Sequence, residues 1–116
     1  MDLRFLRDYC LQKPNTEETY PFDGQTAVFR VANKMFLLTN ADQCVSINVK
    51  CDPQKALELR EAYPDVVVGG FHQNKKHWNT IYLNQTMPNK EILAWIDHSY
   101  ALVAPKKEDN KPQIKP

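Results

Sequence analysis

The segment from Cys44 to Lys50 is the clearest strand pattern in the chain. Val45, Ile47 and Val49 alternate there with small or polar residues. Because successive side chains of a strand point to opposite faces of a sheet, this segment predicts a sheet with one apolar face and one polar face. The apolar face needs a cover, whereas the polar face can remain in contact with solvent.

Further strands are predicted on both sides of this segment. Alternation predicts a strand over residues 27–32, and a tight turn at Asn33-Lys34 joins it to a strand over residues 35–39. The second of these strands is apolar at both odd and even positions, so its two faces cannot be assigned. Residues 78–84 predict another strand with Ile81 and Leu83 toward the core. The β-branched run 66–68 fits an edge strand or an extended connection.

Three segments have the apolar spacing of helices, and a capping residue stands at the start of each: residues 2–13 with Asp2, residues 53–62 with Asp52, and residues 89–103 with Asn89. The order is helix, three strands, helix, one or two strands, helix. This order predicts an α+β fold of two layers, in which the helices pack on one face of an antiparallel sheet. The other face, called the open face below, is left uncovered.

The remaining segments complete one domain over residues 1–104, a length that can bury a core of its own. Residues 15–24 are rich in turn-forming and acidic residues, and they predict a loop that Tyr20 and Phe22 fasten to the core. Residues 105–116 are too polar to offset the entropy of ordering, so a disordered tail is expected.

Composition excludes several classes of protein. No apolar run approaches the roughly 18 residues that span a bilayer, and the charged N-terminal residues do not form a signal peptide. Three cysteines, an odd number at scattered spacing, are typical of reduced thiols. We therefore expect a cytoplasmic monomer without a membrane partner.

Metal binding and catalysis are not expected either. A zinc site built from Cys44, Cys51, His72 and His77 would lack the tight Cys pairs of structural zinc sites. Cys51 precedes a helix N-terminus, but no residue can be identified as its base. A phosphate-binding glycine loop, a nucleophile elbow and a paired acidic motif are all missing. The sequence therefore predicts no metal, no cofactor and no enzyme.

The stretch Gly70–Leu83 concentrates the unusual side chains of the chain. If the alternation holds, the open face and the loop beside it carry eight candidate binding residues: Arg30, Lys50, His72, Lys75, Lys76, His77, Trp78 and Tyr82. Lysine and arginine bind phosphates, and aromatic rings stack on bases or contact sugars. A peptide could use the same surface. The alternative reading is structural, with Trp78 covering the core and the histidines holding the loop.

Many ordered motifs also resemble the MmcQ/YjbR family, from about Leu6 to Val103. They are Lys13-Pro14 with Glu17-Glu18, Pro21-Phe22, Phe29-Arg30-Val31, Lys34-Met35-Phe36, Ile47–Pro53, Leu59-Arg60, Gly70-Phe71-His72, Asn74–Trp78, Thr80-Ile81 and Ser99-Tyr100. The resemblance implies a domain akin to the CyaY-like and secretion-chaperone-like folds, with a DNA-binding, double-wing label. The chain departs from the family at Asn84–Met87, where a turn built around Asp-Gly is usual.

The charge of the chain limits how tightly it can hold DNA. A net charge of +1 is far from the strongly basic balance of a dedicated nucleic-acid binder. Two or three phosphate contacts give sequence-independent binding with a Kd on the order of 10⁻⁴ M or weaker. The leading hypothesis is therefore weak binding of duplex DNA. The alternative is a module that binds a protein or peptide with the same face.

Overall fold

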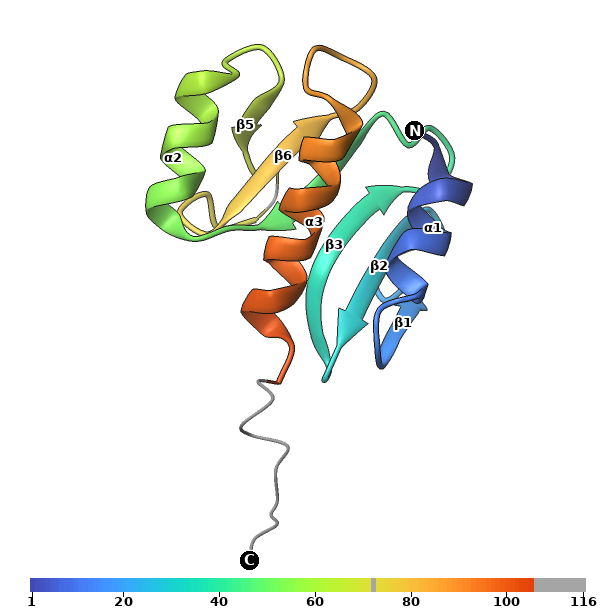
Figure 1. Ribbon diagram of the computed structural model, residues 1–116. Coiled ribbons are helices and arrows are strands. Elements are labelled where there is room, and N and C mark those ends of the chain that lie inside the picture. The colour runs from blue at the N-terminus through green and yellow to red at the C-terminus, as the bar shows by residue number, and fades with distance from the viewer. Residues whose placement is uncertain (72, 106–116) are drawn as a thin grey trace, which may run out of the picture.

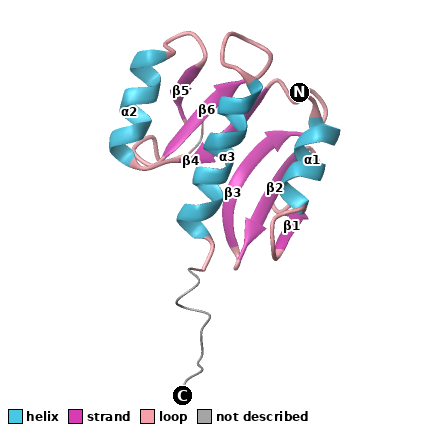
Figure 2. Ribbon diagram, in the orientation of Figure 1, coloured by secondary structure: helices cyan, strands magenta, loops and turns pink. Residues whose placement is uncertain are grey.

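The computed structural model describes residues 1–71 and 73–105, and it confirms the α+β class (Figures 1 and 2). The elements in chain order are α1 (Leu3–Leu11), β1 (Thr16–Thr19), β2 (Thr26–Val31), β3 (Lys34–Asn40), β4 (Ser46–Lys50), α2 (Pro53–Ala62), β5 (Val67–Gly69), β6 (Trp78–Tyr82) and α3 (Asn89–Val103). The strands form one six-stranded antiparallel sheet in the order β1-β2-β3-β4-β6-β5. His72 and residues 106–116 of the predicted tail lie outside the described residues.

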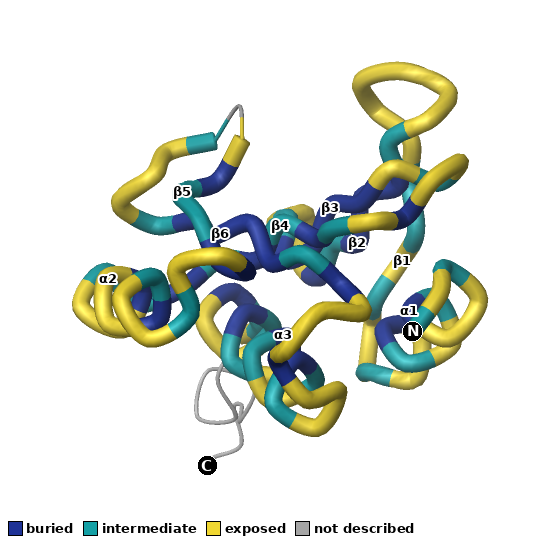
Figure 3. The backbone as a smooth tube through the Cα atoms, turned by 90° about the horizontal axis from the view of Figure 1, so that it is seen from above, coloured by how far each residue is buried: buried dark blue, intermediate teal, exposed yellow. Residues whose placement is uncertain are grey.

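All three helices cover the same face of the sheet (Figure 3). Helix α3 lies against β3 and β4, α1 against β1, and α2 against β5 and β6. The core between the layers holds fully buried Phe29, Ile47, Ile81, Ile92 and Ile96. The predicted two-layer arrangement is therefore confirmed.

A β-bulge in β3 explains why its faces could not be assigned from the sequence. Phe29 pairs with Leu37 while Arg30 pairs with Met35, so Phe36 is an extra residue in β3. Both Phe36 and Leu37 are fully buried in the core. The bulge thus turns two consecutive apolar side chains toward the helices.

Ser99 of α3 ties this bulge to the neighbouring strand. Its buried hydroxyl donates to the carbonyl oxygen of Phe36 at 2.5 Å and accepts from the backbone N–H of Lys50 at 2.9 Å. The bulge and the end of β4 are therefore held by one side chain. Two backbone groups that would otherwise be buried without partners are satisfied in this way.

The helix caps were predicted correctly at two of three helices. The carboxylates of Asp2 and Asp52 accept from the backbone N–H groups of Phe5 and Lys55. The prediction for α3 was wrong, because Pro88 occupies the cap position and Asn89 is already helical. Proline has no side-chain acceptor, so this helix begins without a side-chain cap.

The β2–β3 turn lies one residue earlier than predicted. Ala32 and Asn33, rather than Asn33 and Lys34, are its central residues, with φ of 52° and 65°. Two consecutive positive φ angles are typical of the type I′ turn that joins twisted strands.

Residues 15–24 were predicted as a loop, but they contain the edge strand β1. Glu18 points toward the helices and forms an ion pair with Arg7 of α1 at 2.7 Å. Glu17 points to the open face, opposite Arg30. Such charges are a common protection of edge strands, and they also hide the apolar alternation by which strands are recognised. The expected anchoring by Tyr20 and Phe22 was also wrong, since these rings are 41% and 60% exposed.

Strand β4 begins at Ser46, two residues later than predicted. Cys44 has a φ of 49°, which turns the chain before the strand. In consequence Cys44 is buried, and Val45, expected in the core, is 55% exposed. The run 66–68, for which two readings were open, forms most of the edge strand β5, paired with β6.

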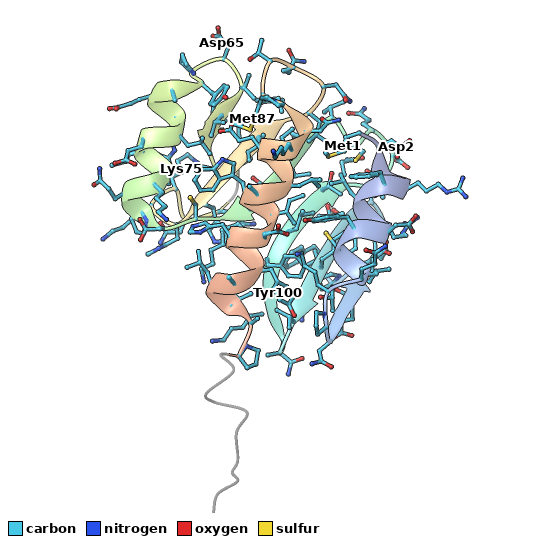
Figure 4. All side chains as sticks on the ribbon, in the orientation of Figure 1. Met1, Asp2, Asp65, Lys75, Met87 and Tyr100 are labelled. Atoms are coloured by element: carbon cyan, nitrogen blue, oxygen red, sulfur yellow. The ribbon has the colours of Figure 1, made fainter. Side chains whose placement is uncertain are left out.

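The segment after β6, where the chain departs from the family pattern, makes an ordered turn. Asn84 has a φ of 59°, and its side-chain amide exchanges hydrogen bonds with the amino group and carbonyl oxygen of Met1. Met87 is buried in the core (Figure 4). No helix in residues 1–71 and 73–105 is both long enough and apolar enough to cross a membrane.

Candidate functional site

The open face has a small apolar cluster of its own. Val28, Leu38 and Trp78 are buried there, and Met35 packs against them. Trp78 is only 7% exposed and belongs to this cluster rather than to the main core. The polar side chains of the open face lie on the same strands, beside this cluster.

A hollow of about 590 Å³, called the cationic hollow below, lies at one end of this face. It is lined by Phe22, Arg30, Asn33, Lys34, Met35, Lys50 and Trp78. No carboxylate is among these lining residues. Arg30, Lys34 and Lys50 come from three adjacent strands, so the sheet itself brings the cations together.

Arg30 has an unusual position in the cationic hollow. Its Nε is buried and has no hydrogen-bond partner among the described residues. Glu17 faces Arg30 across the β1–β2 pair, but no ion pair joins them within the part of the chain that the structure describes. Arg30 as a whole is half-buried, and the terminal nitrogens of a guanidinium can bind a planar or tetrahedral anion.

A second hollow of about 570 Å³, called the amide hollow below, continues along the open face. Its lining includes Phe22, Asp23, Asn40, Asn48, Phe71 and Gln73. No lysine or arginine is among the lining residues. Phe22 lines both hollows, and β3 and β4 contribute residues to both linings. The two hollows together are called the trough below.

Two loops lie on the side of the sheet away from the helices, the segment 20–25 and the segments next to residue 72 (Figure 3). Both contribute to the lining of the amide hollow, through Phe22 and Asp23 and through Phe71 and Gln73. Asp23 shapes the first loop, because its Oδ1 accepts from the backbone N–H groups of Gln25 and Thr26 at 2.8 and 2.7 Å. These bonds lower the pKa of the Asp23 carboxyl. Asp23 therefore keeps its negative charge at the edge of the amide hollow.

The second loop is fixed to the strands below it. The N–H of Phe71 donates to Thr80 Oγ1 at 3.1 Å, and the Thr80 hydroxyl donates to Asn48 Oδ1 at 2.5 Å. Gly70 lies so close to Trp78 that a Cβ on Gly70 would stand 2.7 Å from the Cβ of Trp78. The loop therefore covers Thr80, which is fully buried although it belongs to the open face.

Lys75 and Lys76 are not part of the trough. Together with residues of α2, including Arg60, they line a separate hollow of about 390 Å³. Lys75 Nζ donates to the carbonyl oxygen of Gly70 at 3.1 Å, and the carbonyl of Lys75 accepts from the Arg60 guanidinium. Arg60 Nε also donates to buried Asn79 at 2.7 Å. Lys75 thus helps to hold the loop in place.

The eight candidate residues fall into separate groups. Arg30, Lys50 and Trp78 meet in the cationic hollow. Tyr82 stands on the open face and contacts Phe71 edge to face, with ring centroids 6.4 Å apart. Half-buried His77 accepts from the N–H of Cys51 through its backbone carbonyl at 2.7 Å. His72 lies outside the described residues.

Sequence reasoning missed Lys34, Phe22 and Phe71 as site residues. Lys34 lies in the cationic hollow, and the two phenylalanines are 60% and 47% exposed at the trough. The sequence signal for the two rings was their position in turn-rich loops, where a large apolar side chain has no periodic core face to join.

The positions of the possible metal ligands and of the cysteines bear on metal binding and thiol chemistry. Within residues 1–71 and 73–105, no three or more His, Cys, Asp and Glu side chains stand close enough to hold a metal ion together. The three cysteines are buried and free of disulfides. Burial raises the pKa of the Cys51 thiol to about 11, which keeps it protonated at neutral pH.

Known proteins match nearly the whole domain. The YjbR family model matches residues 11–102. The uncharacterized protein YbdF of Escherichia coli O157:H7 is 35% identical over 95 residues, 81% of this chain and 77% of that protein. The uncharacterized protein YjbR of Escherichia coli K12 is 30% identical over 101 residues, 86% and 85% of the two chains.

A solved structure agrees with these relatives. The crystal structure of Deinococcus radiodurans protein DR2400, a DUF419 domain, superposes with a TM-score of 0.86 at 37% identity, over 95% of this chain and 83% of that one. Sequence and fold therefore lead to one conclusion: this chain belongs to the MmcQ/YjbR family.

Proposed function

We propose that the chain binds nucleic acid, DNA in the first instance, weakly and without sequence preference through the cationic hollow. The observation that carries this proposal is the convergence of Arg30, Lys34 and Lys50 on one hollow with no carboxylate in its lining. Arg30 as a whole is only half-buried, so the accessible part of its guanidinium can contact a phosphate oxygen.

The number of cations sets the strength of binding. Three phosphate contacts predict a slope of about −2.7 for log K against log salt, so the affinity falls about 40-fold between about 50 and 200 mM salt. Lys75 and Lys76 lie in the neighbouring hollow and can add at most a peripheral contact. The low net charge of +1 agrees with weak binding rather than tight binding.

The two loops beside the trough have the role of two wings in this proposal. Each carries an exposed phenylalanine: Phe22 lines both hollows, and Phe71 lines the amide hollow. We further propose that the protein acts as a cytoplasmic monomer that binds without catalysis. Its three free thiols are compatible with a reducing compartment.

A salt-dependent titration tests the proposal. Labelled DNA is titrated with the wild type and with a Lys34→Ala, Lys50→Ala double variant, and fluorescence anisotropy gives Kd at several salt concentrations. We expect the double variant to weaken binding at low salt and to reduce the slope by about 2. Lys90→Ala is the control, since exposed Lys90 lies on α3, on the helix side of the sheet. No binding by the wild type at low salt would overturn the proposal.

A second candidate is a module that binds a peptide with apolar side chains. The amide hollow favours it, because the exposed rings of Phe22 and Phe71 line this hollow and no cation does. Saturable binding of an uncharged, apolar peptide that Phe71→Ala weakens, without nucleic-acid binding at low salt, would favour this function. Peptide binding that ignores Phe71→Ala would exclude the trough as its site.

A further inference from the structure

We infer that the nucleic acid that fits the open face is a single strand with unpaired bases rather than a duplex. This inference rests on the proposed function and names the substrate class of the same site. It differs from the duplex expected from the sequence, because the structure exposes side chains that recognise the faces of bases.

The first observation is the pair of exposed rings. Phe22 and Phe71 belong to different loops, and both line the amide hollow. The aromatic residues expected to contact DNA are less accessible, because Trp78 is buried and Tyr82 is half-buried against Phe71. Phenylalanine rings can stack on any base, but only where the face of that base is free.

The second observation is the polar lining between the rings. Asn48 Oδ1 is occupied by the hydroxyl of Thr80, and Asn40 Oδ1 accepts from two backbone N–H groups of its own turn. The Nδ2 groups of these asparagines have no hydrogen-bond partner among the described residues. They can therefore donate to the carbonyl oxygens and ring nitrogens on the edge of an unpaired base.

The third observation is how the two hollows are joined. Phe22 and residues of β3 line both the cationic hollow and the amide hollow. A phosphate in the first hollow and its base in the second can therefore be held side by side. Each hollow, at about 590 and 570 Å³, is in the size range of a small-molecule site. A duplex presents phosphates to the cations, but its stacked bases cannot enter the space between the rings.

The test compares a single-stranded oligonucleotide of about 12 nucleotides, mixed in sequence, with the blunt duplex of the same sequence. Both are titrated at about 50 mM salt with the wild type, Phe22→Ala, Phe71→Ala and Phe5→Ala. Phe5 is the matched control, because this ring is comparably exposed but lies on α1, on the helix side of the sheet.

We expect the wild type to bind the single strand at least about tenfold more tightly than the duplex. Each of Phe22→Ala and Phe71→Ala should weaken single-strand binding about tenfold, within the range for loss of one stacked base. Duplex binding should change less than twofold, and Phe5→Ala should leave both affinities unchanged.

Three results would overturn the inference, and they are distinguishable from one another. Equal or tighter binding of the duplex, still lost in the Lys34→Ala, Lys50→Ala variant, would reject the single strand and leave the proposed function intact. Binding of neither nucleic acid at low salt would reject both. Equal losses of single-strand affinity in Phe22→Ala and Phe5→Ala would also contradict stacking in the trough.

Discussion

The two faces of this sheet are built from the same strands but have different tasks. On the helix face, Phe29, Ile47 and Ile81 are fully buried in one continuous core. On the open face, their neighbours Arg30 and Asn48 are only half-buried. Most of the apolar area that stabilises the fold is therefore on one side, so the other side can carry polar and charged groups at little cost in stability.

The open face has one region that breaks this division. Trp78 and Thr80 point away from the helices but are buried, because the loop carrying Gly70 and Phe71 lies over them. This loop therefore contributes both to the stability of the fold and to the proposed binding surface. Substitutions there should affect both properties, whereas substitutions elsewhere should affect one.

The largest effect is expected on the helix face. Phe29→Ala removes a fully buried ring from the core and should lower the free energy of unfolding by about 3–5 kcal/mol. The matched substitution Phe22→Ala removes the same ring from the open face and should change stability by no more than about 0.5 kcal/mol. Urea unfolding followed by circular dichroism measures both. Similar losses in the two variants would contradict the division between the faces.

Ser99→Ala should have the next largest effect. It leaves the carbonyl of Phe36 and the N–H of Lys50 without their buried partner, at a cost of about 2–3 kcal/mol. Ser46→Ala is the control, since Ser46 is half-buried on the open face and its side chain has no hydrogen bond among the described residues. Equal unfolding midpoints for the two variants in urea would show that the β3 bulge does not depend on Ser99.

Gly70→Ala tests the place where the two faces are coupled. Its new Cβ would stand 2.7 Å from the Cβ of Trp78, so the loop must shift, at a cost of about 1–3 kcal/mol. Gly24→Ala is the matched control, because nothing lies within 4 Å of a Cβ at that position. We expect a change in tryptophan fluorescence only for Gly70→Ala. An unchanged spectrum and midpoint would mean that the loop does not fix Trp78.

The sequence predicts those parts of the fold that local chemistry decides. The alternation of Ile47 and Val49 identified β4, and the carboxylates of Asp2 and Asp52 marked two helix starts. Strand β1 was missed because pairing with β2, rather than its own polar residues, makes it a strand. The bulge at Phe36 was missed for a similar reason, since only the register with β2 reveals an extra residue.

The candidate site was predicted less well than the fold. Alternation correctly brought Arg30, Lys50 and Trp78 to one face, because this depends only on the period of a strand. The exclusion of Lys75 and the exposure of Phe71 depend on how the loop before β6 folds back over the sheet. That path is set by tertiary contacts with Gly70 and Thr80, for which the sequence has no periodic signal.

The smallest effect is expected in the pH dependence of stability, which His98 on the helix side should influence. On the helix side, the N–H of Asp52 donates to Nε2 of His98 at 3.1 Å, and burial lowers the pKa of His98 below its usual 6.5. The unfolded chain therefore binds a proton before the folded chain does, and stability should fall as the pH decreases below 6.5. His98→Gln keeps an acceptor that does not titrate, so its unfolding free energy should vary less between pH 7 and about 5. An identical pH dependence in both proteins would contradict this role of His98.

The most direct test of the account is to map where a nucleic acid binds. Backbone amide chemical shifts of ¹⁵N-labelled protein are recorded while a short single-stranded oligonucleotide is added at low salt. The account predicts that shift changes concentrate at the trough, around Arg30, Lys34, Asn48, Lys50 and Phe71, and leave α1, α2 and α3 unchanged. Changes concentrated on the helices, or none at saturating oligonucleotide, would contradict the claim that the open face is the binding surface.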